Sequence, residues 1–199
     1  MIGITGGVGA GKTEVLKIIE ESCNCRIIHS DDVGNRVKEP QGECYEEIVS
    51  LLGNGILKED GTIDRGKMAE RIFSDQELLS KVNGIIHPAV KRYILKELEK
   101  ERENGTFTYF FIEAALLIED GYDKICDELW YIHTEDEVRK ARLKASRGYS
   151  DEKTEQIMKN QRCREEFEKY CRITIDNSKD RENTRAQIKK ALASCRKLS

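Results

Sequence analysis

The chain has 199 residues, of which 36% are charged and 38% hydrophobic, and its formal net charge is −3. This length and balance are typical of a globular chain with a sizeable core, and they exclude an intrinsically disordered protein. The small net charge predicts no general attraction to nucleic acid or to acidic membranes. No run of 18 uncharged apolar residues occurs, so we expect no membrane span, no signal peptide and a cytoplasmic location.

The first thirty residues alternate between strand and helix patterns. Ile2–Thr5 is a short apolar run that leads into a glycine-rich loop. Lys12–Ser22 follows, with apolar residues spaced as on the buried face of a helix. Arg26–His29 predicts a second strand, which we expect to lie beside the first.

Residues 31–104 show no strong strand pattern. Helical patterns occur at Tyr45–Leu52, Lys67–Phe73, Glu77–Asn83 and Pro88–Glu103. Pro88 suits the first position of a helix, where the missing N–H costs nothing. This segment therefore looks like a helical insertion.

The remaining residues return to alternation. Strands are predicted at Phe107–Ile112, Glu128–His133 and Arg172–Ile175, and helices at Glu135–Arg147, from Ser150 onward and at Arg181–Ala193. Strands that alternate with helices indicate an α/β fold with a parallel sheet covered by helices on both faces. The helices at 135–169 form a second insertion in that core.

The seven cysteines are an odd number and form no C-x-x-C pair, although Cys23 and Cys25 form a C-x-C pair. No histidine lies at zinc-finger spacing from them. We therefore expect scattered reduced thiols, not a metal site or a disulfide framework.

The loop at residues 6–13 reads G-G-V-G-A-G-K-T and satisfies the pattern G-x-x-x-x-G-K-[ST]. It follows an apolar strand and opens an amphipathic helix, which is the context that a phosphate-binding loop requires. Its glycines let backbone N–H groups approach phosphate oxygens. Lys12 would reach the β and γ phosphates and Thr13 would offer its hydroxyl to Mg²⁺, so we expect a nucleoside triphosphate here.

Other phosphate-loop classes fit the chain less well. The dinucleotide pattern G-x-G-x-x-G is not met. A GTPase should carry N-K-x-D, but the lysine of Asn177-Ser178-Lys179-Asp180 is one position late. A motor or transporter ATPase usually has an Asp-Glu pair after its third strand, whereas Glu113 stands alone. These comparisons favour a small-molecule kinase.

A kinase must also handle the acceptor hydroxyl. Asp31 follows the second predicted strand, where its carboxylate would face the γ-phosphate. It could equally cap a helix that begins near Asp32. Both interpretations of Asp31 stay open at this point, and Asp32 is the weaker candidate.

Several blocks in a fixed order resemble the dephospho-coenzyme A kinase family over nearly the whole chain. After the phosphate loop come Ile28-His29-Ser30-Asp31, Val37-Lys38-Glu39-Pro40, Asp60-Gly61-Thr62-Ile63-Asp64-Arg65, Glu70-Arg71-Ile72-Phe73, His87-Pro88, Leu116-Leu117-Ile118-Glu119 and Ile175-Asp176-Asn177. The resemblance implies transfer of the ATP γ-phosphoryl group to the ribose 3′-hydroxyl of dephospho-coenzyme A. It also implies a three-part build: a nucleotide core (1–30, 105–134 and 170–199), a helical substrate subdomain (31–104) and a lid (135–169).

The resemblance implies roles for individual residues. Lys12, Asp31 and Arg142 would be catalytic, with Asp31 as the proposed base. The ATP site would comprise Gly7, Gly9, Ala10, Gly11, Lys12, Thr13, Glu14, Arg142, Arg147 and Asn177, the last bordering the adenine. Arg65 and His87 would lie on the substrate side with Asp31, although His87 could also cap a helix before Pro88.

The match departs from the family pattern at three places. Glu14 stands where the family usually has Ser or Thr, and its carboxylate would mildly repel the α-phosphate. Glu113 and Ala115 replace an Asp and a Pro, and Glu113 could act on Mg²⁺ through water. The second lid arginine is displaced by one residue, with Ser146 and Arg147 at these positions.

We expect ATP and dephospho-coenzyme A as small-molecule partners, Mg²⁺ with ATP, and a monomer or weak homo-oligomer. Two alternatives remain open. One is another nucleotide or metabolite kinase of the same fold. The other is a regulatory ATP-binding module that has lost catalysis, which the presence of both Lys12 and Asp31 disfavours.

Overall fold

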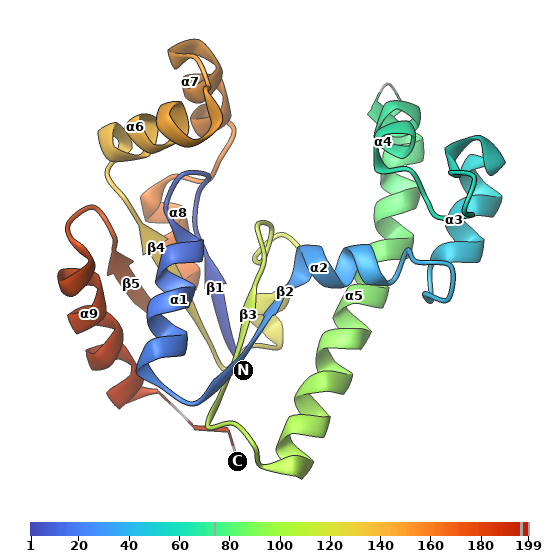
Figure 1. Ribbon diagram of the computed structural model, residues 1–199. Helices are drawn as coiled ribbons and strands as arrows, with labels where there is room; N and C mark the ends of the chain where they lie inside the picture. Colours follow the sequence, from blue (N-terminus) through green and yellow to red (C-terminus); the bar gives the residue numbers. More distant parts are fainter. Residues whose placement is uncertain (74, 196, 199) are drawn as a thin grey trace. The chain divides into compact units, whose positions relative to one another are not determined.

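Each apolar run that predicted a strand forms one, with bounds that move by one or two residues. The computed structural model, which describes residues 1–73, 75–195 and 197–198, contains β1 (Ile2–Thr5), β2 (Cys25–His29), β3 (Tyr109–Glu113), β4 (Glu128–His133) and β5 (Ile173–Asp176). The pairings of β1 with β3, of β1 with β4 and of β4 with β5 are parallel. The α/β fold with a parallel sheet is therefore confirmed (Figure 1).

The strand order is β2-β3-β1-β4-β5, so the expectation that β2 lies beside β1 is wrong. The buried strand β3 lies between them. The burial pattern explains this order: Tyr109–Ile112 are buried in β3, whereas only Ile28 is fully buried in β2. A strand buried on both faces takes an inner place in a parallel sheet, and a half-exposed one takes the edge.

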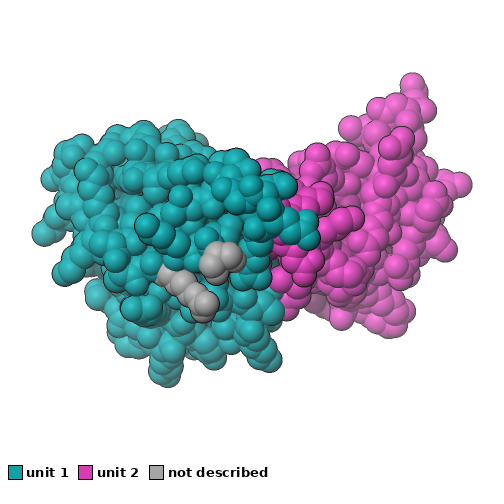
Figure 2. All heavy atoms as spheres, turned by 90° about the horizontal axis from the view of Figure 1, so that it is seen from below, with its two compact units in different colours: residues 1–27, 101–199 teal, residues 28–100 magenta. Residues whose placement is uncertain are grey.

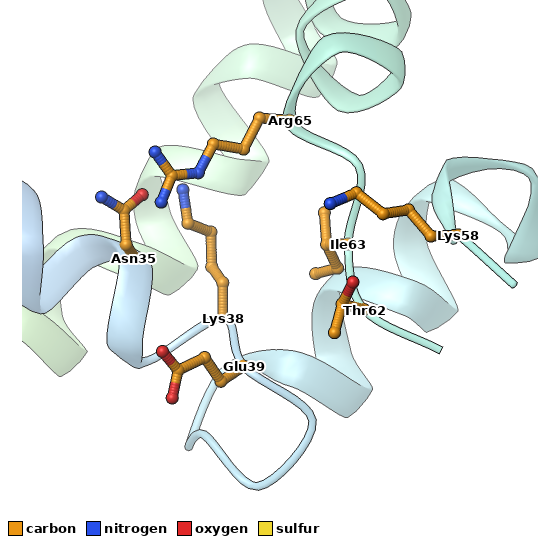
Figure 3. A pocket seen from close by; sticks show the side chains of 7 residues that line it. All are labelled: Asn35, Lys38, Glu39, Lys58, Thr62, Ile63 and Arg65. Carbon is orange, nitrogen blue, oxygen red and sulfur yellow. The ribbon is translucent and has the colours of Figure 1, made fainter. Parts of the chain in front are cut away.

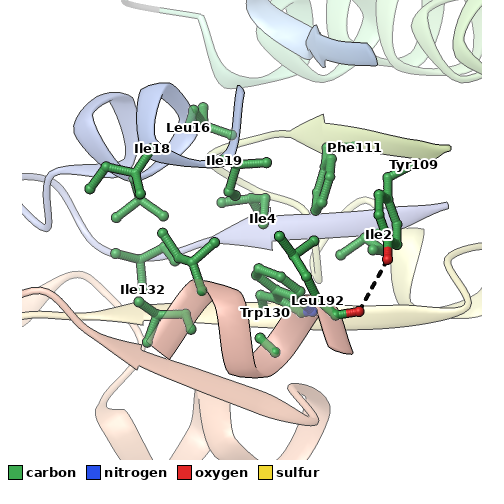
Figure 4. Packing of buried hydrophobic residues seen from close by; sticks show 14 of the residues in the cluster. Ile2, Ile4, Leu16, Ile18, Ile19, Tyr109, Phe111, Trp130, Ile132 and Leu192 are labelled. Atoms are coloured by element: carbon green, nitrogen blue, oxygen red, sulfur yellow. Dashed lines mark hydrogen bonds between the residues drawn. The ribbon is translucent and has the colours of Figure 1, made fainter. Parts of the chain in front are cut away.

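Helices cover both faces of the sheet. On one face, α1 (Lys12–Ser22) and α9 (Arg181–Ser194) pack against each other, and the core beneath them contains Trp130 and Ile132 of β4 (Figure 4). Trp130 meets the ring of Phe111 edge to face at 5.6 Å. Because neighbouring side chains of a strand point to opposite faces, Tyr131 faces the other way. There its ring stacks on Phe167 at 4.5 Å between centroids.

Phe167 belongs to the last of three consecutive helices that follow β4. These are α6 (Asp136–Arg147), α7 (Asp151–Lys159) and α8 (Arg164–Tyr170). A short 3₁₀ turn, η2 (Tyr122–Lys124), precedes β4. By its packing on β4, α8 is part of the layer that covers the sheet.

The chain divides into two compact units, residues 1–27 with 101–199 and residues 28–100, which Figure 2 shows in different colours. Within the second unit lie α2 (Ser30–Arg36), α3 (Tyr45–Leu52), the 3₁₀ turn η1 (Asn54–Ile56), α4 (Arg65–Phe73) and most of α5 (Gln76–Asn104). The predicted helical subdomain and core also include residues 74, 196 and 199, which lie outside the described residues. In the described part of the chain, no helix is both long and apolar enough to cross a membrane.

A single helix, α5, replaces the two helices predicted at 77–83 and 88–103, so the expectation of a helix start at Pro88 is wrong. Pro88 removes only one backbone hydrogen bond, to the carbonyl of Gly84. Buried residues continue at helical spacing on both sides of it, from Val82 through Ala89 and Val90 to Ile94. The packing of this face offsets the lost bond, and His87 lies inside the helix, not at a cap.

Candidate active site

A glycine loop, residues 6–11, joins β1 to α1. Gly9 and Gly11 have φ of 82° and 80°, in the left-handed region that favours glycine, and Gly11 forms the N-cap of α1. Gly6 is required by space, because a Cβ there would lie 2.6 Å from the carbonyl oxygen of Ile132. The loop therefore carries backbone N–H groups to the positive end of a helix, where phosphate groups bind.

Lys12 lies at the start of α1 and turns back across the loop. Its Nζ donates to the carbonyl oxygen of Gly6 at 2.9 Å and lies 3.7 Å from Oε1 of Glu113. Glu113 ends β3, the neighbour of β1 in the sheet. The ammonium and this carboxylate thus meet at the carboxyl edge of the sheet, where ligands of open α/β proteins bind.

Thr13 is exposed at the first turn of α1, and Glu14 beside it forms an ion pair. Nε of Arg181, in α9, donates to Oε1 of Glu14 at 2.7 Å. Arg181 also binds Glu21 at 2.7 Å, and these two carboxylates raise the pKa of its guanidinium, Glu21 more strongly. The Glu14 carboxylate is therefore partly neutralised, which reduces the repulsion expected toward a nucleotide phosphate.

The carbonyl oxygen of Ala10 accepts hydrogen bonds from three side chains that come from distant parts of the chain. Oγ1 of Thr134 and Nδ2 of Asn177 each donate to it at 2.9 Å, and Nη1 of Arg142 at 3.4 Å. Nη2 of Arg142 also donates to the carbonyl oxygen of Asn177 at 2.9 Å. The predicted residues Arg142 and Asn177 are thus brought together at the loop.

Asn177 is buried, and both polar atoms of its side-chain amide form hydrogen bonds within the protein. Its Oδ1 accepts from Oγ1 of Thr184 at 3.1 Å while Nδ2 holds Ala10. A Cβ at Gly11 would lie 2.4 Å from this Nδ2, so glycine at that position also makes room for the asparagine. The side chain of Asn177 therefore braces the phosphate loop.

Two further residues of this site were missed by the sequence analysis, and both bind the backbone of Val8. Nε of Arg139 donates to the Val8 carbonyl oxygen at 3.1 Å, and Oε1 of Gln161 accepts from the Val8 N–H at 3.2 Å. Nη2 of Arg139 donates to the same Oε1 at 2.5 Å. A Cβ at Gly7 would lie 2.5 Å from Arg139 and 2.6 Å from Gln161.

Arg139 could have been found from the sequence because it lies three residues before Arg142, on the same face of one helix. Gln161 gave no such signal. It lies between α7 and α8, 153 residues after Val8, and only the tertiary structure brings it to the loop.

The second predicted lid arginine, Arg147, lies elsewhere. It is exposed at the end of α6 and its guanidinium lies 5.9 Å from the centre of the Tyr149 ring. Among the described residues it makes no hydrogen bond or ion pair with the phosphate loop. Ser146 turns inward on its own helix and donates to the carbonyl oxygen of Arg142 at 2.7 Å.

The second unit carries the residues predicted for the acceptor side. Asp31 and Asp32 are both exposed in the first turn of α2, which has His29 as its N-cap. The alternative that Asp31 caps this helix is therefore wrong, because the helix begins one residue before it. Arg65 is exposed at the first residue of α4, and His87 is half-buried inside α5.

All seven cysteines are free thiols, and none belongs to the phosphate loop. Burial raises the pKa of Cys171 to about 12, and burial with the neighbouring Glu128 raises that of Cys195 to about 12. These two thiols are held in the protonated form that is a poor nucleophile.

The chain is similar to known proteins in both sequence and structure. The family model described as dephospho-CoA kinase matches residues 1–183. The dephospho-CoA kinase of Aquifex aeolicus is 38% identical over 190 residues, which are 95% of this chain and 94% of that protein. That of Carboxydothermus hydrogenoformans is 33% identical, over 94% of this chain and 90% of its own length.

The solved structures agree at the level of the fold. A Thermus thermophilus protein superposes with a TM-score of 0.79 at 27% identity, covering 96% of this chain and 95% of its own. A dephospho-CoA kinase from Campylobacter jejuni gives 0.73 at 22% identity, covering 96% and 94%. With a complete phosphate loop and relatives that match along almost its whole length, the chain belongs to the dephospho-CoA kinase family.

Proposed function

We propose that this protein transfers the γ-phosphoryl group of ATP to the ribose 3′-hydroxyl of dephospho-coenzyme A, giving coenzyme A and ADP. The observation that carries the proposal is the braced phosphate loop with Lys12 and Glu113 at the sheet edge. Membership of the family over residues 1–183 supports the choice of acceptor.

In this proposal the loop and its lysine bind the triphosphate. The N–H groups of Gly9 and Gly11 and the positive end of α1 offer hydrogen bonds to phosphate oxygens, whereas the N–H of Ala10 donates to the carbonyl oxygen of Gly7 at 3.1 Å. Lys12 exchanges its contact with the Gly6 carbonyl for the transferred phosphoryl group, whose negative charge it stabilises. Arg142 holds the loop through Ala10 and supplies a second positive charge beside it.

Asp31 handles the acceptor proton and Arg65 and His87 bind the acceptor in this proposal. The support for Asp31 is its exposed carboxylate in the first turn of α2, where nothing in the described residues forms an ion pair with it. In phosphoryl transfer the proton leaves late, so this carboxylate orients the hydroxyl as well as accepting its proton.

Mg²⁺ is the expected metal because Thr13 and Glu113 offer the oxygen ligands that it prefers. The Thr13 hydroxyl is exposed at the end of the loop, and Glu113 would act through a bound water. When bound with ATP, the ion neutralises negative charge on the phosphates. We further propose that residues 135–169 act as a lid and that the protein is a cytoplasmic monomer or weak homo-oligomer.

A coupled assay of ADP release tests the proposal. We expect turnover with dephospho-coenzyme A and Mg²⁺, and loss of turnover when a chelator removes the metal. Faster turnover of adenosine or a nucleoside monophosphate would identify a different metabolite kinase. Tight ATP binding without transfer to any acceptor would identify a regulatory module.

A further inference from the structure

The second unit contains a polar cavity of about 190 Å³ that is lined by three cationic side chains, those of Lys38, Lys58 and Arg65. Figure 3 shows the amine of Lys38 beside the guanidinium of Arg65, with Lys58 on the opposite wall. Glu39 is the one carboxylate among the lining residues. The cavity therefore collects more positive than negative charge.

The cations have no partner that would explain their grouping. Among the described residues, no hydrogen bond or ion pair is made by the charged groups of Lys38, Lys58 and Arg65. The nearby acids are engaged with backbone instead: Oδ1 of Asp60 accepts from the N–H of Thr62 at 2.9 Å, and Oδ1 of Asp64 accepts from the N–H of Gly66 at 2.8 Å. Three cations around one cavity, with Glu39 as the one lining carboxylate, leave an excess of positive charge that favours an anion.

The grouping of the cations affects the pKa of the Lys38 ammonium. Burial, and after it the charge of Arg65, lower the pKa of Lys38, while the carboxylate of Asp31 acts in the opposite sense. A bound anion would relieve the repulsion between Lys38 and Arg65. Asp31 lies one helical turn before Asn35 in α2, and Asn35 lines the cavity, so Asp31 is near it.

Local hydrogen bonds hold the backbone of the cavity walls, so the segments that carry the cations are positioned before any ligand arrives. On one side, the N–H of Lys38 donates to the carbonyl oxygen of Asn35 at 3.1 Å, and the N–H of Cys44 returns to the carbonyl oxygen of Val37 at 2.9 Å. On the other side, the N–H of Lys58 donates to the carbonyl oxygen of Thr62 at 2.8 Å. Such preorganisation lowers the cost of binding.

We propose that the cavity lined by Lys38, Lys58 and Arg65 binds a diphosphate group, namely the diphosphate bridge of the acceptor. This inference rests on the proposed function and names a site within it. Dephospho-coenzyme A carries its diphosphate on the same ribose that bears the accepting 3′-hydroxyl. A site for the diphosphate beside Asp31 therefore fits a hydroxyl handled by Asp31. Charge-assisted hydrogen bonds from lysine and arginine are the usual means of binding such a group.

Steady-state kinetics with two acceptors test the assignment. The variants are Lys38→Met and Arg65→Met, which remove charge while keeping an apolar stem. Lys81→Met is the matched control, because Lys81 is an exposed lysine of the same unit whose Nζ pairs with Glu77 at 2.7 Å. The acceptors are dephospho-coenzyme A and adenosine, which lacks the diphosphate.

For each cavity variant we expect the KM for dephospho-coenzyme A to rise roughly tenfold, with the KM for ATP within about twofold of the parent. The fall in kcat/KM should be much smaller with adenosine than with dephospho-coenzyme A, and Lys81→Met should behave as the parent with both acceptors. An unchanged KM for dephospho-coenzyme A, or an equal loss with both acceptors, overturns the assignment.

Calorimetric titration with inorganic pyrophosphate, at a saturating concentration of a non-hydrolysable ATP analogue, needs no turnover. It therefore separates failure of the cavity from failure of the proposed reaction. We expect binding to the parent and to Lys81→Met, and loss of binding in the Lys38→Met, Arg65→Met double variant. Binding that survives in the double variant overturns the site. If the cavity binds pyrophosphate but its variants leave the KM for dephospho-coenzyme A unchanged, the bound diphosphate is not that of the acceptor, and the proposal is overturned.

Discussion

Lys12 is the residue on which the proposed chemistry depends most. Its ammonium is held between the Gly6 carbonyl oxygen at 2.9 Å and the Glu113 carboxylate at 3.7 Å. Neither contact spans the hydrophobic core, so the fold does not depend on this side chain. Its removal should therefore affect catalysis and leave folding intact.

Lys12→Ala is expected to lower kcat by about 10²-fold or more, because charge on the transferred phosphoryl group loses its main stabilising cation. Lys17→Ala, at an exposed position of the same helix, is the matched control and should keep parental activity. ADP release measures both, and circular dichroism checks folding. Activity of Lys12→Ala within about tenfold of the parent would contradict the role.

Asp31 and Asp32 form a natural pair for testing the acceptor side, because both are exposed in the first turn of α2. Asp31→Asn keeps the shape but cannot take the proton, so kcat should fall by roughly 10²–10⁴-fold with ATP affinity little changed. Asp32→Asn should be much milder. A large loss of kcat in Asp32→Asn alone would assign the acceptor proton to Asp32 and contradict the role of Asp31. Mild effects of both changes would leave Glu113 as the next carboxylate to test.

At the scale of elements, the segment that contains α6, α7 and α8 is attached to the phosphate loop at two points. Arg139 and Gln161 hold both the N–H and the carbonyl oxygen of Val8, and Arg142 reaches Ala10. A phosphate group that binds the loop must compete with Gln161 for the Val8 N–H. Binding of a phosphate group to the loop should therefore alter the contacts that hold α6 and the α7–α8 connection to it.

Hydrogen exchange of residues 135–169 is expected to change when an ATP analogue and the acceptor are added, as for a lid that closes on its substrates. The helix α1, whose apolar face is buried in the core, is the internal reference and should change mainly at its first turn. Mass spectrometry of peptides from both segments measures this. Equal exchange of residues 135–169 with and without ligands would count against a lid.

On the scale of the whole molecule, the sheet unit is stabilised by a core that joins residues from both ends of the chain. Ile4 of β1, Trp130 of β4 and Ile188 of α9 are fully buried in it. Trp130 is the only tryptophan, so its fluorescence reports the unfolding of this unit. The fluorescence of Trp130 receives no tryptophan signal from the second unit, residues 28–100.

Ile4→Ala should lower the free energy of unfolding of the sheet unit by about 2–5 kcal/mol, because it leaves a cavity in a closely packed core. Leu116→Ala is the matched control: Leu116 is 52% exposed, and its loss should cost less than about 1 kcal/mol. Urea unfolding followed by Trp130 fluorescence measures both. Equal midpoints for the two variants would contradict this description of the core.

The features that depend on neighbouring residues could be predicted from the sequence alone. The glycine pattern and Lys12 predicted the phosphate loop, because positive φ and a helix start are local requirements. Alternating apolar runs predicted all five strands and the α/β fold, which the structure confirms. The ordered blocks identified the family for the same reason, since each block is a short local motif.

The features that join distant residues could not be predicted, because they arise only in the folded chain. Placing β3 between β1 and β2 depends on which strand is buried on both faces, and no single segment encodes that choice. The continuation of α5 through Pro88 depends on packing that outweighs a local rule. Gln161 at Val8 and Lys38 beside Arg65 likewise arise from chain folding. Local patterns specify elements, whereas contacts between elements form only when the whole chain is folded.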